Sequence, residues 1–188
     1  MDLLMKVRHL ITTCTAALLL ATTQMASATT LKVSTDAFTE GGKVNVSAAD
    51  TPAECGTGKR HNPQVSWSNL PANTQSMAVL ILDVDGHNGL GVSHWVTYNI
   101  PAHRGGIKEG EALVSVPGIT VGKNIAGTAD FRGFCPAPGD QPHHYVLTVI
   151  ATDLKPGALP EGLTREELMA RLSGHALAGR NVVGLYGH

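Results

Sequence analysis

Polar residues that could do chemistry gather in two stretches of the sequence, each beside a strongly apolar segment. They are Asp83, Asp85, His87 and His94 in the first stretch, and Pro136, Pro138, His143, His144 and Tyr145 in the second. A carboxylate beside a histidine favours the imidazolium form, so such a pair can hold a donor toward an anion near neutral pH. A tyrosine hydroxyl can add a contact to a phosphate or carboxylate, and an aspartate can bind an ammonium group. These residue types indicate a small binding site for an anionic ligand.

The two stretches meet only if the strands beside them are neighbours. Residues 77–82 are apolar on both faces and predict a buried central strand that ends at Asp83. A hairpin between this strand and residues 94–100 would place Asp83 and His94 at the same edge of the sheet. An antiparallel strand at residues 145–152 would bring the second stretch to that edge. The expected pocket consists of Asp83, His94, His143 and Tyr145, with Asp85, His87 and His144 as accessory residues.

The same side chains permit two other kinds of site. One is a zinc or copper site drawn from Asp83, Asp85, His87, His94, His143 and His144. Its ligand spacing matches no recognised helix or knuckle motif. The other is a hydrolase built from Ser93, His94 and Asp83, but the sequence lacks a G-x-S-x-G elbow, and adjacent strand residues point to opposite faces. We therefore predict a binding protein that is not an enzyme and needs no metal or cofactor.

Composition favours an all-β fold with a few short helices. The 188 residues are 43% hydrophobic and only 15% charged, and they include 21 Gly and 10 Pro. Short β-type runs between turn signals are typical of an antiparallel sandwich. The expected strands are residues 31–34, 43–47, 65–67, 77–82, 94–100, 113–116, 145–152 and 182–186. A net charge of −1 without a basic run gives no electrostatic footprint for nucleic acid.

One stretch predicts an α-helix, at about residues 165–177. Leu168, Leu172 and Ala176 recur at helical spacing. Thr164 and Glu167 form a capping box before the apolar run. The helix carries no cluster of side chains suited to catalysis or ligand binding, so we expect it to pack against the sheet.

Residues 1–28 have the pattern of a secretory signal peptide. Lys6 and Arg8 precede an apolar segment at residues 10–21, and Ala26-Ser27-Ala28 is an A-x-A cleavage signal. A transmembrane anchor would need about 20 apolar residues, and a lipoprotein signal at Cys14 lacks the usual small residues before it. We expect cleavage near Ala28, a single domain at residues 29–188 without a membrane span, and a periplasmic or secreted protein.

Two cysteines, Cys55 and Cys135, remain after removal of the signal segment. An even number in an oxidising compartment predicts one disulfide, and two buried thiols are the alternative.

The two stretches resemble the phosphatidylethanolamine-binding protein family, in particular its bacterial Raf-kinase-inhibitor-like branch. The similarity runs from about residue 31 to residue 186. The matching segments, in order, are NPQVSW at 62–67, LDVD at 82–85, HWVTYNIP at 94–101, and CPAPGD with HHY at 135–145.

The resemblance implies a β-sandwich of two antiparallel sheets with a small anion pocket at one end. In the family, that pocket accepts phosphate, acetate, cacodylate or a phosphorylethanolamine head group. The binding residues of the family's motifs fall on Asp83, His94, His143 and Tyr145, with Pro136 and Pro138 in the wall.

This chain departs from the family pattern in both motifs. Val84 replaces the first proline of Asp-Pro-Asp, and Gly86-His87 replaces the Ala-Pro that follows. His144 stands where the family has an arginine, so a titratable ring replaces a permanent planar cation.

The predicted function is an exported, non-enzymatic binding protein for a phosphate or a phospholipid head group. An alternative is an inhibitor or modulator of a protease or signalling partner that acts through surface loops. A hydrolase or metalloprotein is a third interpretation. The sequence leaves open the physiological ligand, the protein partner and the choice between monomer and homodimer.

Overall fold

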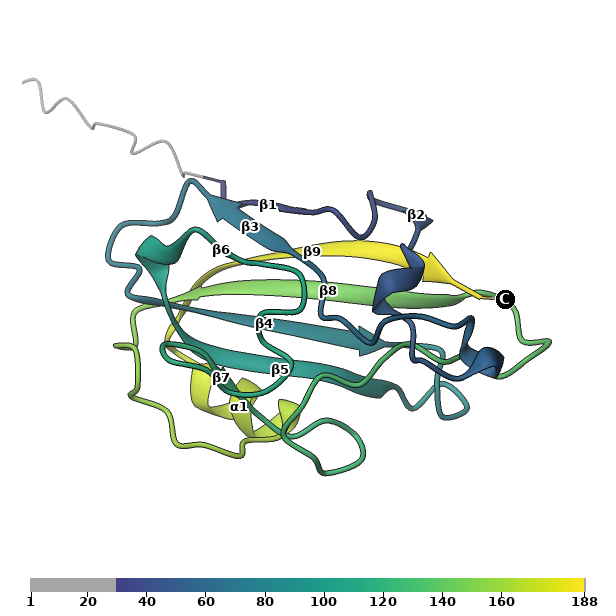
Figure 1. Ribbon diagram of the computed structural model, residues 1–188. Coiled ribbons are helices and arrows are strands. Elements are labelled where there is room, and N and C mark those ends of the chain that lie inside the picture. The colour runs from purple at the N-terminus through teal and green to yellow at the C-terminus, as the bar shows by residue number, and fades with distance from the viewer. Residues whose placement is uncertain (1–29, 188) are drawn as a thin grey trace, which may run out of the picture.

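Two β-sheets form a sandwich in the computed structural model, which describes residues 30–187 (Figure 1). The larger sheet has the strand order β2-β9-β8-β4-β5-β7 and the smaller has the order β1-β3-β6. All neighbouring strands are antiparallel except β2, which runs parallel to β9. The expected all-β sandwich with one C-terminal helix is confirmed, whereas the predicted signal segment at residues 1–28 lies outside the described residues.

The strands differ widely in length, and the long ones form the centre of the larger sheet. They are β1 (Lys32–Thr35), β2 (Gly42–Lys43), β3 (Val65–Ser68), β4 (Ser76–Asp83), β5 (Val92–Pro101), β6 (Gly106–Ile107), β7 (Thr120–Val121), β8 (His143–Thr152) and β9 (Ala176–Tyr186). One α-helix, α1 (Arg165–Leu172), and three short 3₁₀ segments, Val46–Ala48, Ala53–Cys55 and Ala102–Arg104, complete the fold. None of the helices described is long and apolar enough to cross a membrane.

Strand β4 is buried on both faces, as its continuous apolar sequence predicts. Val79 and Ile81 belong to the core between the two sheets. Leu80 belongs to a second core on the outer face of the larger sheet, where Leu168 and Leu172 of α1 pack. Both faces of β4 are therefore covered, which explains why its residues do not alternate between apolar and polar types.

Helix α1 begins as predicted but ends five residues early. Thr164 Oγ1 accepts a hydrogen bond from the Glu167 N–H (3.3 Å), and Glu167 Oε2 accepts one from the Thr164 N–H (2.8 Å). The expected extent to residue 177 is wrong because α1 ends at Leu172 and Gly174 adopts a left-handed conformation with φ of 82°. The following residues pair with β8 as the start of β9, and this long ladder overrides the local helical period.

Two of the predicted strands are also altered. Residues 43–47 contribute only the end of β2, and the 3₁₀ turn Val46–Ala48 follows. Residues 113–116 form no regular strand, because Val116 and Ile119 pair with each other across Pro117-Gly118. Proline followed by a glycine at φ of 78° is the sequence of a tight type II turn.

The predicted disulfide between Cys55 and Cys135 is present, with their Cα atoms 4.5 Å apart. It joins the last residue of the second 3₁₀ segment to the loop that precedes β8. A hydrogen bond from the Phe134 N–H to the Ala48 carbonyl (3.0 Å) joins the start of the same loop to the first 3₁₀ segment. The loop that carries the second polar stretch is therefore fixed at its start.

Candidate functional site

Three strand ends meet where the sequence predicts a pocket. Asp83, the last residue of β4, is paired with Tyr145 of β8 on one side and with Val92 of β5 on the other. The two polar stretches, about 60 residues apart in sequence, therefore lie at one edge of the larger sheet. This confirms the expected hairpin and the expected antiparallel neighbour.

A β-bulge at His94 determines the direction in which this residue points. Ile81 is paired with Trp95 and the next residue, Leu82, is paired with Ser93, so His94 is the extra residue on β5. A bulge lets two consecutive residues share a face of the sheet. The simple alternation expected for adjacent strand residues does not hold for His94 and Trp95.

Ring contacts show that both side chains enter the core between the sheets. The His94 ring makes edge contacts with Phe134 and Tyr145, with ring centroids 5.2 and 5.4 Å apart. Trp95 makes an edge contact with Phe131 at 6.0 Å. The bulge thus adds His94 to the aromatic wall of the site without removing Trp95 from the core.

Asp83 and His143 form the charged centre of the site. His143 Nδ1 lies 2.8 Å from Asp83 Oδ2, and the other carboxylate oxygen of Asp83 accepts hydrogen bonds from the N–H groups of Asp85 (3.0 Å) and Gly86 (2.9 Å). The Asp83 residue is only 3% exposed. Asp140 lies at the outer side of His143, with 3.4 Å between its Oδ2 and His143 Nε2.

The imidazolium form of His143 is favoured by its neighbours. Burial lowers the pKa of His143, but the hydrogen bond and charge of Asp83, the charge of Asp85 and the hydrogen bond with Asp140 outweigh it, so the pKa is raised above its usual value. His143 therefore remains a cation to a higher pH than a free histidine.

The neutral form of His94, unlike that of His143, is favoured by its surroundings. Its Nδ1 lies 2.9 Å from the Arg132 carbonyl, which can only accept, so Nδ1 carries the proton and Nε2 keeps a lone pair. Burial lowers the pKa of His94 to about 4, and the positive charge of Arg132 acts in the same direction. At neutral pH His94 is an uncharged ring, and its free nitrogen is a hydrogen-bond acceptor.

Tyr145 contributes a buried hydroxyl. Its ring stacks on Phe134, with centroids 3.9 Å apart. Among the described residues, no group lies within hydrogen-bonding geometry of the Tyr145 Oη, although this atom is inaccessible to solvent. Burial and the nearby charge of Asp83 raise the pKa of Tyr145, so the hydroxyl keeps its proton. A buried O–H without a partner is costly, and the acceptor that acts most strongly on this one is the Asp83 carboxylate.

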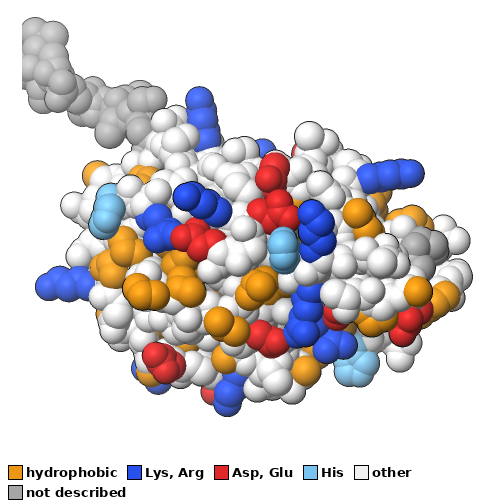
Figure 2. Space-filling view, viewed as in Figure 1, with side chains coloured by type: hydrophobic (Ala, Val, Ile, Leu, Met, Phe, Trp, Pro, Cys, Tyr) orange, Lys and Arg blue, Asp and Glu red, His pale blue; other side chains and the backbone are white. Residues whose placement is uncertain are grey.

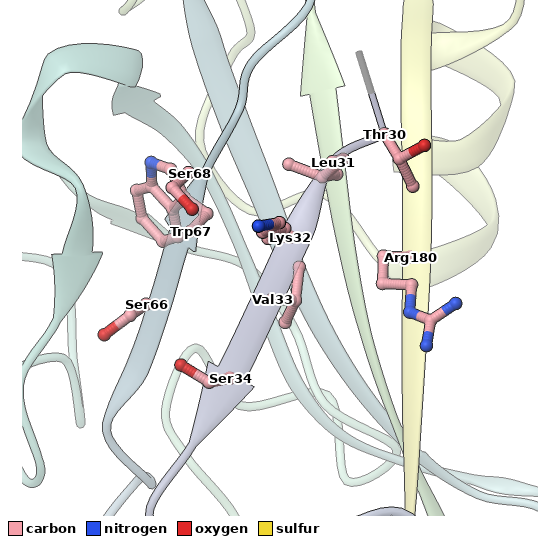
Figure 3. Close-up of a pocket in the computed structure, with 9 residues that line it drawn as sticks. All are labelled: Thr30, Leu31, Lys32, Val33, Ser34, Ser66, Trp67, Ser68 and Arg180. Carbon is pink, nitrogen blue, oxygen red and sulfur yellow. The ribbon is translucent and has the colours of Figure 1, made fainter. Parts of the chain in front are cut away.

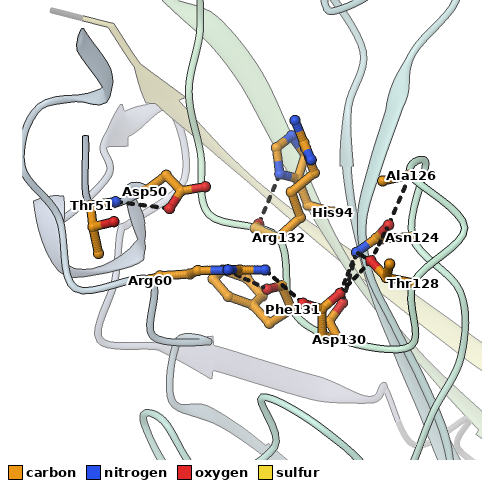
Figure 4. Close-up of polar contacts among 10 residues, drawn as sticks. All are labelled: Asp50, Thr51, Arg60, His94, Asn124, Ala126, Thr128, Asp130, Phe131 and Arg132. Atoms are coloured by element: carbon orange, nitrogen blue, oxygen red, sulfur yellow. Dashed lines mark hydrogen bonds and ion pairs between the residues drawn. The ribbon is translucent and has the colours of Figure 1, made fainter. Parts of the chain in front are cut away.

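A loop network supports the Arg132 carbonyl and was not predicted from the sequence (Figure 4). Asn124 Nδ2 donates to Thr128 Oγ1 (2.9 Å) and Asp130 Oδ1 (2.7 Å). Arg60 donates to Asp130 Oδ2 (2.6 Å) and to the Phe131 carbonyl. Arg60 and Asp130 are 70 residues apart, so no local pattern indicates that they meet.

The accessory residues fall in two different places. Asp85 Oδ2 accepts hydrogen bonds from the His144 N–H (2.6 Å) and from His144 Nδ1 (2.8 Å), and the backbone bond in particular lowers the pKa of Asp85. This exposed pair joins the loop after β4 to the start of β8. His87 instead lines a separate cavity on the α1 side of the sheet. Within residues 30–187, no three His, Cys, Asp or Glu side chains gather as metal ligands would.

The proline-rich loop leads from Phe134 to the start of β8. Pro136 is buried, whereas Pro138 is exposed. The loop also carries Asp140, whose contact with His143 the sequence did not predict.

A groove of about 580 Å³ lies away from these residues, between β1 and β9 (Figure 3). Trp67 is buried in its floor, and its charged residues are Lys32 and Arg180. No carboxylate or histidine lines it, so it lacks the paired groups found at Asp83 and His143.

On the face seen in Figure 2, basic and acidic side chains are interspersed and no large area carries one sign of charge.

Known proteins resemble this chain in sequence over most of its length. Residues 34–187 match the family model described as phosphatidylethanolamine-binding protein. A UPF0098 protein of Aquifex aeolicus is 32% identical over 130 residues, which cover 69% of this chain and 75% of the relative. The UPF0098 protein YbcL of Escherichia coli K12 is 39% identical over 100 residues, which cover 50% of this chain and 54% of YbcL.

Solved structures share the fold. The crystal structure of Escherichia coli YbcL, described as a new member of the mammalian PEBP family, superposes with a TM-score of 0.75 and 26% identity, covering 84% of this chain and 98% of YbcL. A PEBP homologue from Chlamydia trachomatis, CT736, superposes with a TM-score of 0.71 at 22% identity, covering 85% of this chain and 99% of CT736. By its sequence and its fold, this chain belongs to the phosphatidylethanolamine-binding protein family.

Proposed function

We propose that this protein is an exported binding protein without enzymatic activity, and that Asp83, His94, His143 and Tyr145 hold a small phosphorylated or otherwise anionic ligand. The observation that carries the proposal is the buried, unpartnered Tyr145 hydroxyl in contact range of the Asp83–His143 pair. Membership of a ligand-binding family supports the same function.

The donors and acceptors of the site suit a phosphate better than a simple cation. The imidazolium of His143 neutralises Asp83, and the Tyr145 hydroxyl is a further donor. An anionic oxygen can replace the exposed Asp140 at His143 Nε2, where the present contact is long at 3.4 Å. The free nitrogen of His94 can accept from a P–OH group or an ammonium group.

Calorimetry tests this site directly. We expect phosphate and phosphorylethanolamine to bind between pH 5 and 8, more weakly as His143 loses its proton. A permanently charged anion such as dimethyl phosphate separates titration of the protein from titration of the ligand. Tyr145→Phe removes only the hydroxyl and should weaken binding about 10- to 150-fold, because a hydrogen bond to a charged group contributes about 1.5–3 kcal/mol.

A matched control is available at His175, which is paired with Asp153 at 2.8 Å on the surface. His175→Ala should leave binding unchanged, whereas His143→Ala should abolish it. Absence of binding by the native protein at every pH would refute the proposal. Recovery of phosphorylethanolamine intact after prolonged incubation, measured by phosphorus NMR, tests the absence of catalysis, and its hydrolysis would contradict it.

Export is supported by the signal pattern of residues 1–28 and by the disulfide, which persists in oxidising compartments. Fractionation of cells that express the full chain should place the protein outside the cytoplasm, with a new N-terminus at Thr29. Uncleaved protein confined to the cytoplasm would contradict export.

A further inference from the structure

A second cavity, of about 500 Å³, lies on the face of β5 opposite to the first site. It is bounded by the ends of β4 and β5, by two loops and by the N-terminus of α1. Its lining residues are Leu82, His87, Leu90, Gly91, Ser93, Lys123, Asn124, Ile125, Gly127, Thr164, Arg165 and Glu166.

Ser93 provides a buried hydroxyl on the cavity side of β5. Its register partner is Leu82, and both residues line the cavity, whereas the bulge turns the neighbouring His94 into the core. The Ser93 residue is 9% exposed, and its Oγ has no hydrogen-bond partner among residues 30–187. Ser93 and Tyr145 are the two described residues with such an orphaned buried side-chain atom, and Tyr145 belongs to the first site.

The first turn of α1 adds backbone donors to the same cavity. The capping box uses the N–H groups of Thr164 and Glu167. The N–H groups of Arg165 and Glu166 have no partner within the described part of the chain, and both residues line the cavity. Free N–H groups and the positive end of the helix dipole favour an anion at this position.

The charged side chains around the cavity agree with an anionic ligand. Lys123 and Arg165 are cations that line it, and Glu166 is its one carboxylate. Arg165 Nη1 lies 3.3 Å from Glu166 Oε1, so this carboxylate is already paired. Lys123 forms no ion pair among the described residues, although the pKa of the nearby Glu167 carboxylate is lowered by the Thr164 hydrogen bonds and, more weakly, by the Lys123 charge. His87 also lines the cavity.

The rim of the cavity is apolar. Leu90 is 81% exposed and Ile125 is 49% exposed, and both line the cavity. Large apolar side chains exposed beside a group of donors indicate a ligand with a polar head and an apolar part.

We propose that this cavity is a second binding site, for an oxyanion carried on a short apolar chain. The anionic head of the ligand would be held by the Ser93 hydroxyl, the Lys123 ammonium, and the N–H groups at the start of α1. The apolar chain of the ligand would lie against Leu90 and Ile125. This site is distinct from the one at Asp83 and His143, since Ser93 and His94 point to opposite faces of β5, and Asn124 links the cavity lining to the loop behind His94.

Amide chemical shifts of the ¹⁵N-labelled protein test the proposal, with hexanoate as the probe. We expect saturable shifts at Ser93, Arg165 and Glu166. Acetate lacks the apolar chain and hexanol lacks the charge, so each should bind at least 5-fold more weakly. Hexyl phosphate in a parallel titration shows whether a carboxylate or a phosphate is preferred. Shifts that remain linear with hexanoate concentration, or that centre on Tyr145, would overturn the proposal.

Variants separate this site from the first one. Ser93→Ala and Lys123→Ala should each weaken hexanoate binding at least 5-fold, while Lys155→Ala, a lysine that does not line the cavity, should not. His143→Ala should remove phosphate binding and leave hexanoate binding intact. Ser93→Ala removes a hydroxyl without a partner, so it should not lower the Tm. Unchanged hexanoate affinity in both Ser93→Ala and Lys123→Ala would refute the assignment.

Discussion

His143 Nδ1 lies 2.8 Å from Asp83 Oδ2, in a pair that joins a half-buried histidine of β8 to a buried carboxylate of β4. The same carboxylate accepts two backbone hydrogen bonds from the turn that follows β4. Asp83 therefore organises the turn and sets the charge of the histidine at once. The proposed anion binding depends on this link, because His143 would supply the cationic group.

Replacing Asp83 by asparagine should lower the pKa of His143. The raised pKa of this histidine depends on the hydrogen bond and charge of Asp83, while burial acts against it. An NMR titration of the His143 ring measures the change directly, and calorimetry at pH 7 should show weaker anion binding. Asp153→Asn, at the exposed His175 pair, is the control. An unaltered His143 titration in Asp83→Asn would contradict this account of the site.

The buried neutral His94 should make the protein sensitive to acid. Its pKa is lowered to about 4, so the unfolded state takes up a proton below pH 6.5 that the native state takes up only near pH 4. This difference in proton uptake stabilises the native state fully above pH 6.5, and the stabilisation is lost as the pH falls toward 4. The expected loss in the free energy of unfolding is about 3 kcal/mol. Urea unfolding at pH 7 and pH 4 measures it.

The free energy of unfolding of His94→Gln should differ much less between pH 7 and pH 4 than that of the native protein. His143 has the opposite sign, because a raised pKa stabilises the native state at low pH and that contribution disappears as the pH rises through the folded pKa. Comparing the native protein with His94→Gln cancels the His143 contribution. An equal loss of stability in both proteins would show that His94 is not the acid-sensitive group.

Asn124→Ala should loosen the loop that holds His94. Asn124 is 5% exposed and its amide donates to Thr128 and Asp130, so the change removes buried hydrogen bonds and should cost about 1–3 kcal/mol. The Arg132 N–H, bonded to the His94 carbonyl at 2.9 Å, should exchange faster with deuterium. Thr120→Ala, which removes one partly buried hydrogen bond from Asn99 of β5 to β7, is a control that should leave Arg132 exchange unchanged.

Removing the disulfide should destabilise the protein by about 2–4 kcal/mol, since the bridge closes a long loop in the unfolded chain. Cys55 and Cys135 are 80 residues apart in sequence. The double variant Cys55→Ser/Cys135→Ser, compared by urea unfolding with the oxidised and the reduced native protein, measures this. The reduced protein and the double variant should have the same free energy of unfolding, below that of the oxidised protein. Equal stability of all three would contradict a structural role for the bridge.

Much of the fold follows from local features of the sequence. The unbroken apolar run of β4 predicts a strand covered on both faces, and Leu80 and Ile81 confirm it by packing on opposite sides. The capping box predicts the start of α1 at the correct residue. Asp83 and the start of β8 could be placed at one edge because antiparallel neighbours bring the end of one strand beside the start of the other.

The tertiary structure decided what depends on partners distant in sequence. The helix stops at Leu172, and the chain from Ala176 onward pairs with β8 as the start of β9. The bulge that turns His94 inward is a matter of register between β4 and β5, and the opposite charge states of His94 and His143 come from burial and neighbouring charge. Residue types and strand ends can be predicted from the sequence. Strand register, burial and the electrostatic environment of each side chain exist only after the chain has folded.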